Sequence, residues 1–383
     1  MHETGGTIEI VATTPRLAEV VQNASRWPSV ALDIESNGFH CYPERVCLVQ
    51  LAVPGSVFLI DPLAVPDAGP LGELLADASV EKILHSADYD LRSLDREWGF
   101  RVRTLFDTSI AAAFVGSTKL GLVAVLHDHL GVEVTKDKKL QRANWTNRPL
   151  SPEAQHYACE DVLYLERTRN LLVKRLRELS RLEWVAEECE RLAEVRYQAR
   201  DPEWAFLSIK GSRTLDSQGL AILRSLHWFR EQEAFQSDRP PFKIISDTVL
   251  VQLAASPCSD LTSVKGLGRF GNPPAAGRLR TAIRDGLRAR PVRRPRQPTR
   301  NGQRLDAARQ GEVGDRLWRL KEWRTGLGQR LRLDPGLLWP ASSLERLARC
   351  LDSLDAELAS PEVRAWQRRE FGESLRIFLA ALA

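Results

Sequence analysis

The chain has 383 residues, of which 43% are hydrophobic and 27% charged, and its formal net charge is +4. No apolar run approaches the roughly 20 residues that a membrane-spanning helix needs, so we expect a soluble protein of two or three domains. Six cysteines form no CxxC pair, which argues against a zinc ribbon and against a disulfide framework. The N-terminus MHETGGTIEI lacks a basic region followed by a hydrophobic one, so the expected location is the cytoplasm.

The first 130 residues predict strands and helices in alternation. Residues 28–61 contain three strand patterns, SVALDIES, RVCLVQLAV and SVFLID, and their short connections favour antiparallel neighbours. Helices are expected at 69–77, 88–98, 109–115 and 119–130, with short strands at 82–85 and in TLFD. This order predicts an α/β domain in which a mixed sheet is flanked by helices.

A further helix is expected to begin after residue 150. Ser151 suits the N-cap and Pro152 the first helical position, and the helical pattern continues to about 179 and then toward 199 after a break. Residues 201–214 read as a connector. Two helical regions follow, to about 290 and from 312 to 383, and we expect most of their tryptophans to lie in helical cores.

These two helical regions are predicted to be a degenerate repeat. LHWFRE around Trp228 and QLA ending at Ala254 are echoed by LKEWRT around Trp323 and RLA ending at Ala348. The two Trp-to-Ala spacings differ by one residue. A repeated spacing of this kind is the pattern that a duplicated helical unit leaves in a sequence.

A basic segment separates the two helical regions. Residues 278–304 hold ten arginines against one aspartate, a net charge of +9, so the remainder of the chain carries −5. Such a segment favours nucleic acid as a partner, and Arg293, Arg294 and Arg296 are the candidate contacts. Its prolines break helices, so a solvated linker is the alternative interpretation.

Acidic residues form a second pattern. Asp33 and Glu35 are two apart in a predicted strand and therefore lie on one face of the sheet, while Tyr157 and Asp161 share a helix face. With Asp90, these carboxylates could stay ionised together only beside cations. Oxygen ligands select ions such as Mg²⁺ or Mn²⁺, and two such ions about 4 Å apart are the usual apparatus for hydrolysis at a phosphate.

The motifs LDIES, KILHSADYDLRSL and HYACEDVLYL, in this order, resemble those of the ribonuclease D family. This family belongs to the tyrosine branch of the DEDD 3′→5′ exonucleases, and its fold is ribonuclease H-like. The likeness covers residues 28–176 and includes ERVCLVQLA, LIDPL, LFDTSIAA and NWTNRPLS. Residues 201–290 resemble an HRDC domain in DTVLVQLA and SVKGL, and 312–383 resemble a divergent second copy. The implied organisation is an exonuclease domain (1–200), an HRDC domain (212–290), a basic Pro/Arg linker (291–311) and an HRDC-like domain (312–383).

The resemblance implies a role for each acidic residue. Asp33, Glu35 and Asp161 would hold the catalytic metal ion, and Asp33 would also touch a second ion beside the leaving 3′ oxygen. Asp90 would contribute through water, and Tyr157 would orient the attacking water. The implied cofactors are therefore two divalent ions, Mg²⁺ or Mn²⁺.

Two of these positions have an alternative nearby, and one further carboxylate could join the site. Asp88 is an alternative to Asp90, although it could simply cap the helix that follows. His156 is an alternative to Tyr157, but on a continuous helix it lies about 140° from Asp161, whereas Tyr157 lies about 40° away. Asp107 could be a further carboxylate of the site, yet its position between a strand and a helix favours a capping role.

The implied activity is a metal-dependent 3′→5′ exoribonuclease that releases nucleoside 5′-monophosphates, with trimming of tRNA and other structured RNA as the expected task. RNA is the expected partner of a monomeric chain. Trp145 and Arg148 are candidate RNA contacts, with a packed tryptophan and a surface arginine as the alternative. A DNA exonuclease in repair and a catalytically silent nucleic-acid-binding adaptor are the rival functions.

Overall fold

The computed structural model describes residues 7–134, 137–257, 260–295 and 307–382. In these residues one mixed sheet lies in the N-terminal third of the chain. Its strands are β1 (Thr7–Val11), β2 (Ser29–Ser36), β3 (Val46–Val53), β4 (Ser56–Ile60), β5 (Glu81–Leu84) and β6 (Leu105–Asp107). The strand order is β1-β4-β3-β2-β5-β6. β2, β3 and β4 pair antiparallel as predicted, while β1 joins β4, and β5 joins β2 and β6, in parallel.

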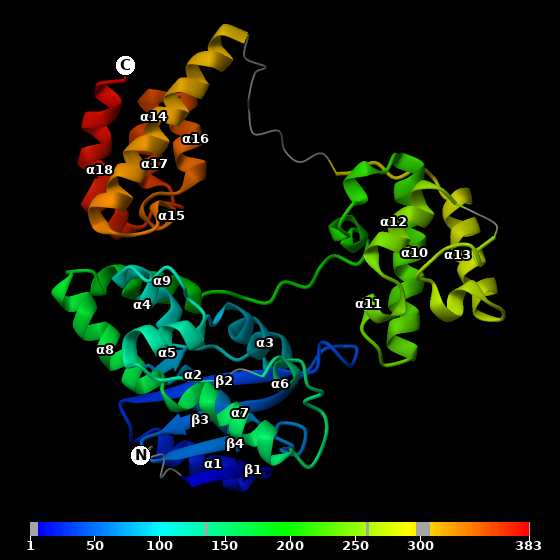
Figure 1. Ribbon diagram of the computed structural model, residues 1–383, viewed down its shortest axis with the longest axis horizontal. Helices are drawn as coiled ribbons and strands as arrows, with labels where there is room; N and C mark the ends of the chain where they lie inside the picture. Colours follow the sequence, from blue (N-terminus) through cyan, green and yellow to red (C-terminus); the bar gives the residue numbers. More distant parts are fainter. Residues whose placement is uncertain (1–6, 135–136, 258–259, 296–306, 383) are drawn as a thin grey trace.

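Helices cover both faces of this sheet (Figure 1). They are α1 (Thr14–Ala24), α2 (Gly69–Ala76), α3 (Asp88–Trp98), α4 (Thr108–Val115), α5 (Leu122–Leu130), α6 (Lys138–Gln141), α7 (Pro152–Leu163), α8 (Leu165–Glu178) and α9 (Leu182–Ala193). Side chains of α1, α2 and α3 share one core with one face of the sheet, and those of α7 and α8 share another core with the opposite face. The predicted α/β fold is confirmed, whereas β1 and α1 were not among the predicted elements.

The first helical domain follows a connector. Its elements are the 3₁₀ turns η1 (Ala205–Ser208), η2 (Ser212–Thr214) and η3 (Gly268–Gly271) and the helices α10 (Ser217–Gln236), α11 (Pro241–Ile244), α12 (Asp247–Ala255) and α13 (Ala275–Arg288). The domain has a hydrophobic core of its own, and α10 contributes the predicted stripe of Ile222, Leu226 and Phe229.

The second helical domain ends the chain. It consists of α14 (Ala307–Leu331), α15 (Pro335–Leu338), α16 (Ala341–Arg349), the turn η4 (Leu351–Ser353), α17 (Leu354–Ala359) and α18 (Ala365–Ala380). In both helical domains a long helix precedes a four-residue helix that starts with proline and then a nine-residue helix. This order supports the predicted repeat. The helix α14 begins at Ala307, so the last five residues of the predicted linker, 307–311, are helical.

The two helical domains attach differently to the N-terminal α/β domain. Trp366 of the second domain stacks on Trp184 of α9 with ring centroids 4.6 Å apart, and one hydrophobic core runs through both domains. Around it, Arg364 pairs with Glu188 at 2.9 Å. The first domain instead makes polar contacts, in which Tyr42 donates its hydroxyl to Glu231 and its backbone N–H to Asp238, and one exposed aromatic contact between Phe39 and Phe242.

Candidate active site

The strand β2 presents two carboxylates on the sheet face that α7 covers. Asp33 and Glu35 point to this face, while Leu32 and Ile34 between them enter the core beneath α1, α2 and α3. Asp33 and Glu35 are half-buried. The alternation of polar and apolar residues in VALDIE thus produces the predicted arrangement.

Asp161 approaches the strand pair from α7. Ser151 caps this helix by accepting the N–H of Ala154, and Pro152 is the first helical residue, as predicted. Asp161 is buried, and one oxygen from each of Asp33, Glu35 and Asp161 lies within 4.8 Å of the others. Three carboxylate oxygens this close form a donor set that suits a hard divalent cation.

Tyr157 lies one turn before Asp161 and faces the same cluster. Burial raises the pKa of its hydroxyl, and so do the nearby carboxylates of Asp161, Glu35 and Asp33. His156 points outward with 73% of its side chain exposed and lies beside Glu160. The structure therefore brings Tyr157, and not His156, to the acidic cluster.

Asp90 lies at the start of α3 beside the cluster. Burial first, and then the charge of Asp33, raises the pKa of its carboxyl well above the usual range. Asp88 points away and pairs with Arg92 at 2.9 Å on the surface, so it neither caps α3 nor reaches the cluster. Crowded negative charge around Asp33 is a condition that a bound cation would relieve.

Asp107 serves the fold rather than the acidic cluster. Its carboxylate caps α4 by accepting the N–H groups of Ser109 and Ile110, as the capping interpretation predicted. It also accepts the N–H groups of Ser86 at 3.1 Å and Ala87 at 2.8 Å. Asp107 thereby fixes the turn that leads into α3 and to Asp90.

A polar network at the end of β2 was not predicted. The Ser36 hydroxyl lies 2.6 Å from that of Tyr89, and Glu44 accepts hydrogen bonds from both residues and from Arg96. Burial and the bond to Glu44 raise the pKa of Tyr89 to about 12. The network joins β2, the β2–β3 loop and α3, whose separation in sequence leaves no local pattern.

Two predicted RNA contacts are corrected by the structure. Trp145 is only 1% exposed and packs near Tyr157 with ring centroids 6.1 Å apart, so it cannot stack on a base. The guanidinium of Arg148 forms a bidentate pair with Asp61 and donates to the carbonyl oxygens of Trp145, Asn147 and Cys47. All five of its N–H donors are thus used inside the fold.

The arginines proposed to contact RNA lie after α13. Arg293 is exposed and Arg294 is half-buried. Arg296 lies outside the described residues. In the described part of the helical domains the tryptophans also divide: Trp339 and Trp366 are buried as expected, but Trp228 and Trp318 are 58% and 64% exposed.

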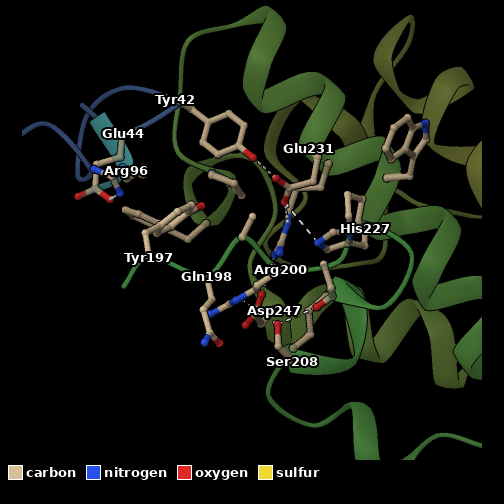
Figure 2. Close-up of a pocket in the computed structure, with 18 residues that line it drawn as sticks. Tyr42, Glu44, Arg96, Tyr197, Gln198, Arg200, Ser208, His227, Glu231 and Asp247 are labelled. Atoms are coloured by element: carbon tan, nitrogen blue, oxygen red, sulfur yellow. Dashed lines mark hydrogen bonds and ion pairs between the residues drawn. The ribbon is translucent and has the colours of Figure 1, made fainter. Parts of the chain in front are cut away.

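A cleft of about 840 Å³ lies between the N-terminal α/β domain and the first helical domain. Figure 2 shows Glu44 and Arg96 on one side and His227 and Glu231 on the other, with Tyr42 bridging to Glu231. Trp228 and Phe242 also line it, and both are more than half exposed. Most charges here are paired, as Arg96 is with Glu44 and Arg230 with Asp247 at 2.7 Å.

Comparison with known proteins places these features in a family. Residues 8–177 match the 3′-5′ exonuclease family. The ribonuclease D of Desulfotalea psychrophila is 30% identical over 352 residues, which cover 89% of this chain and 91% of that one. The ribonuclease D of Xanthomonas oryzae is 36% identical over 267 residues, or 69% and 72% of the two chains.

A solved structure extends the likeness to the whole fold. The crystal structure of Escherichia coli RNase D, described as an exoribonuclease involved in structured RNA processing, matches with a TM-score of 0.70 and 23% identity. The match covers 98% of this chain and 99% of that one. Every described helix is too short or too polar to span a bilayer. With its acidic motifs gathered at one end of β2 and its relatives matched over most of their length, the chain belongs to the ribonuclease D family and is a 3′→5′ exoribonuclease.

Proposed function

We propose that the chain shortens RNA from its 3′ end by one nucleotide at a time and releases nucleoside 5′-monophosphates, using two divalent ions, Mg²⁺ or Mn²⁺. The observation that carries this proposal is the meeting of Asp33, Glu35 and Asp161 within 4.8 Å. The proposed substrates are precursors of tRNA and other structured RNA, and the proposed location is the cytoplasm. The chain is proposed to act as a monomer.

The side chains of the acidic cluster would have different roles in catalysis. Asp33, Glu35 and Asp161 would hold the first ion, and Asp33 with Asp90 would serve the second. The ions would supply activation of water and stabilisation of charge at the phosphate. Tyr157 would orient the attacking water, because its hydroxyl belongs to a buried side chain directed at the three carboxylates. In the reaction the water oxygen bonds to phosphorus as the bond from phosphorus to the 3′ oxygen breaks.

The RNA strand is proposed to reach this site across the cleft of Figure 2. Trp228 and Phe242 offer exposed rings there, and Phe242 meets Phe39 edge to face with ring centroids 6.5 Å apart. Phe39 is itself exposed and follows Glu35 by four residues. Exposed aromatic rings bind successive bases of a single strand by stacking, independently of sequence. Arg293, Arg294 and Arg296 are proposed to add contacts to phosphates.

The proposal is tested by digestion of a 5′-labelled single-stranded RNA with Mg²⁺ or Mn²⁺. We expect a ladder that shortens from the 3′ end, requires the ion and disappears in Asp33→Ala. Asp88→Ala is the matched control, because Asp88 lies at the surface and pairs with Arg92. A matched DNA strand in parallel separates an RNA from a DNA exonuclease. Binding of RNA without shortening under either ion would contradict the proposal and favour a silent adaptor.

A further inference from the structure

Gln50 of β3 lies beside the acidic cluster. In the β2–β3 ladder it pairs directly with Asp33, and across β4 it pairs with Leu59. Directly paired residues of antiparallel strands project to the same face of the sheet. The Gln50 side chain therefore lies on the face that carries Asp33 and that α7 covers, and its exposed fraction is 0%.

The surroundings of Gln50 are almost entirely apolar. Leu48 and Ala52 precede and follow it on the same face of β3, and with Leu59 they belong to the core shared with α7. Within the described residues neither Oε1 nor Nε2 of the Gln50 amide has a hydrogen-bond partner. A buried amide without partners costs about 1–3 kcal/mol per group, so an apolar residue of similar volume would be more stable at this position.

The strand register limits which polar group can form a hydrogen bond with the side-chain amide of Gln50. Side chains directly opposite each other in an antiparallel pair have Cβ atoms about 4.5–5.5 Å apart, within reach for a glutamine and an aspartate. Asp33 is the side chain opposite Gln50, and its carboxylate has more acceptor sites than one metal ion uses.

We infer that Gln50 is a positioning residue for Asp33. On metal binding the Gln50 amide, which has no partner among the described residues, turns so that its Nε2–H donates to one carboxylate oxygen of Asp33 and fixes its orientation, which leaves the other oxygen directed at the metal ion. The inference rests on the proposed role of Asp33 as a metal ligand. Groups that orient a ligand in this way contribute about 10–100-fold to metal affinity.

The first test is calorimetric titration of the full chain with Mn²⁺ in the absence of RNA. We expect Gln50→Met, which keeps the length of the side chain and removes the amide, to weaken Mn²⁺ binding about 10–100-fold. The melting temperature without added metal ion should not fall, because methionine removes two buried polar groups that lack partners before the ion binds. Unchanged Mn²⁺ affinity in a folded Gln50→Met variant would overturn the inference.

Leu48→Met is the matched control, because Leu48 lies on the same face of β3 and opposite Glu35. It changes the packing only slightly and involves no amide, so its Mn²⁺ affinity should stay close to that of the wild type. Equal weakening in Leu48→Met and Gln50→Met would assign the effect to packing and overturn the inference.

A second measurement needs no variant of Gln50. In the wild-type protein with Mg²⁺, one side-chain amide proton of Gln50 should resonate downfield of its partner, as expected for donation to a carboxylate, and Asp33→Asn should reduce this separation. Two amide protons at unbonded positions would overturn the inference. Wild-type protein that fails to bind Mn²⁺ at all would instead overturn the proposed metal site itself.

Discussion

The two helical domains share an order of elements but differ in how they meet the exonuclease domain. The second domain buries Trp366 and Phe371 against Trp184 of α9, so its core and that of the exonuclease domain are one. The first domain keeps a separate core and meets the exonuclease domain through polar contacts, one exposed aromatic pair and a wide cleft. Apolar burial holds two domains together more firmly than exposed polar contacts do. The residues on the contact surface of each helical domain, and not the order of helices that both share, therefore decide how firmly that domain is held to the exonuclease domain.

Deletion of the helical domains is a poor test of their contribution to RNA binding. Truncation of both helical domains would also expose the apolar side chains of α4 and α9, including Phe114 and Trp184, which Trp366 covers. A loss of RNA binding would then be mixed with loss of the exonuclease fold. Single substitutions in the full chain separate the two effects.

The largest expected effect is on the shared core. Trp366→Ala should destabilise the protein by about 3–5 kcal/mol, because it removes a fully buried aromatic ring that stacks on Trp184. Chemical unfolding, followed by circular dichroism, measures this change. Leu226→Ala in the core of the first helical domain is the control and should leave unfolding of the exonuclease domain unaltered. If both variants lowered the free energy of unfolding of the exonuclease domain equally, the two helical domains would not differ in how firmly they are attached to it.

An intermediate effect is expected on RNA affinity. Trp228→Ala should weaken binding of single-stranded RNA by about 1–3 kcal/mol through loss of one stacked base. Since no charge is removed, the slope of affinity against salt should not change. Trp318→Ala is the matched control, because Trp318 is equally exposed but lies on the second helical domain. The affinity of each variant for RNA is measured by fluorescence anisotropy, and each variant also carries Asp33→Ala so that the RNA is not digested. Equal weakening by Trp318→Ala would mean that both helical domains grip RNA.

The smallest expected effect is on the polar junction. Tyr42→Phe removes the hydroxyl that donates to Glu231 and should loosen the first helical domain by about 1–2 kcal/mol. Hydrogen exchange should rise in the β2–β3 loop and in α10, while α9 and α18 stay protected. Faster exchange in α18 would contradict the separation of the two attachments.

The same junction should respond to alkaline pH. Burial, and then the bond to Glu231, raises the pKa of Tyr42 from about 10 to about 12 in the folded protein. The folded state therefore favours the protonated hydroxyl, so its stabilising contribution is complete below pH 10 and is lost as pH rises toward 12. Tyr42→Phe should exchange faster than wild type at pH 8, and this difference should shrink between pH 10 and 12. A difference that persists unchanged would contradict the role of the hydroxyl.

The sequence predicted the exonuclease fold and the acidic cluster where local patterns were strong. Alternation in β2 placed Asp33 and Glu35 on one face, and the Ser151 cap fixed the phase of α7 so that Tyr157 accompanied Asp161. These are short-range effects, in which neighbouring residues decide the direction of a side chain.

Contacts between residues far apart in the sequence could not be predicted in this way. Arg148 was a candidate RNA contact because its partner Asp61 lies 87 residues away, and Trp145 was another because no local pattern shows its burial. Docking of Trp366 on Trp184 joins residues 182 apart. Periodicity in a single sequence reports which face of a helix is apolar, but not which other element covers it.

The stack of Trp184 and Trp366 has a spectroscopic consequence. Two indole rings 4.6 Å apart and 15° from parallel are close enough for their excited states to couple. The resulting near-ultraviolet dichroism would arise only while the second helical domain rests on α9, so the chain carries its own optical label for this contact. The first helical domain, whose Trp228 is exposed at the cleft, would contribute a different emission, and RNA bound there as proposed would change it. The intrinsic tryptophan signals could thus report, without added dyes, whether the second helical domain is docked on α9 and whether RNA is bound at the first.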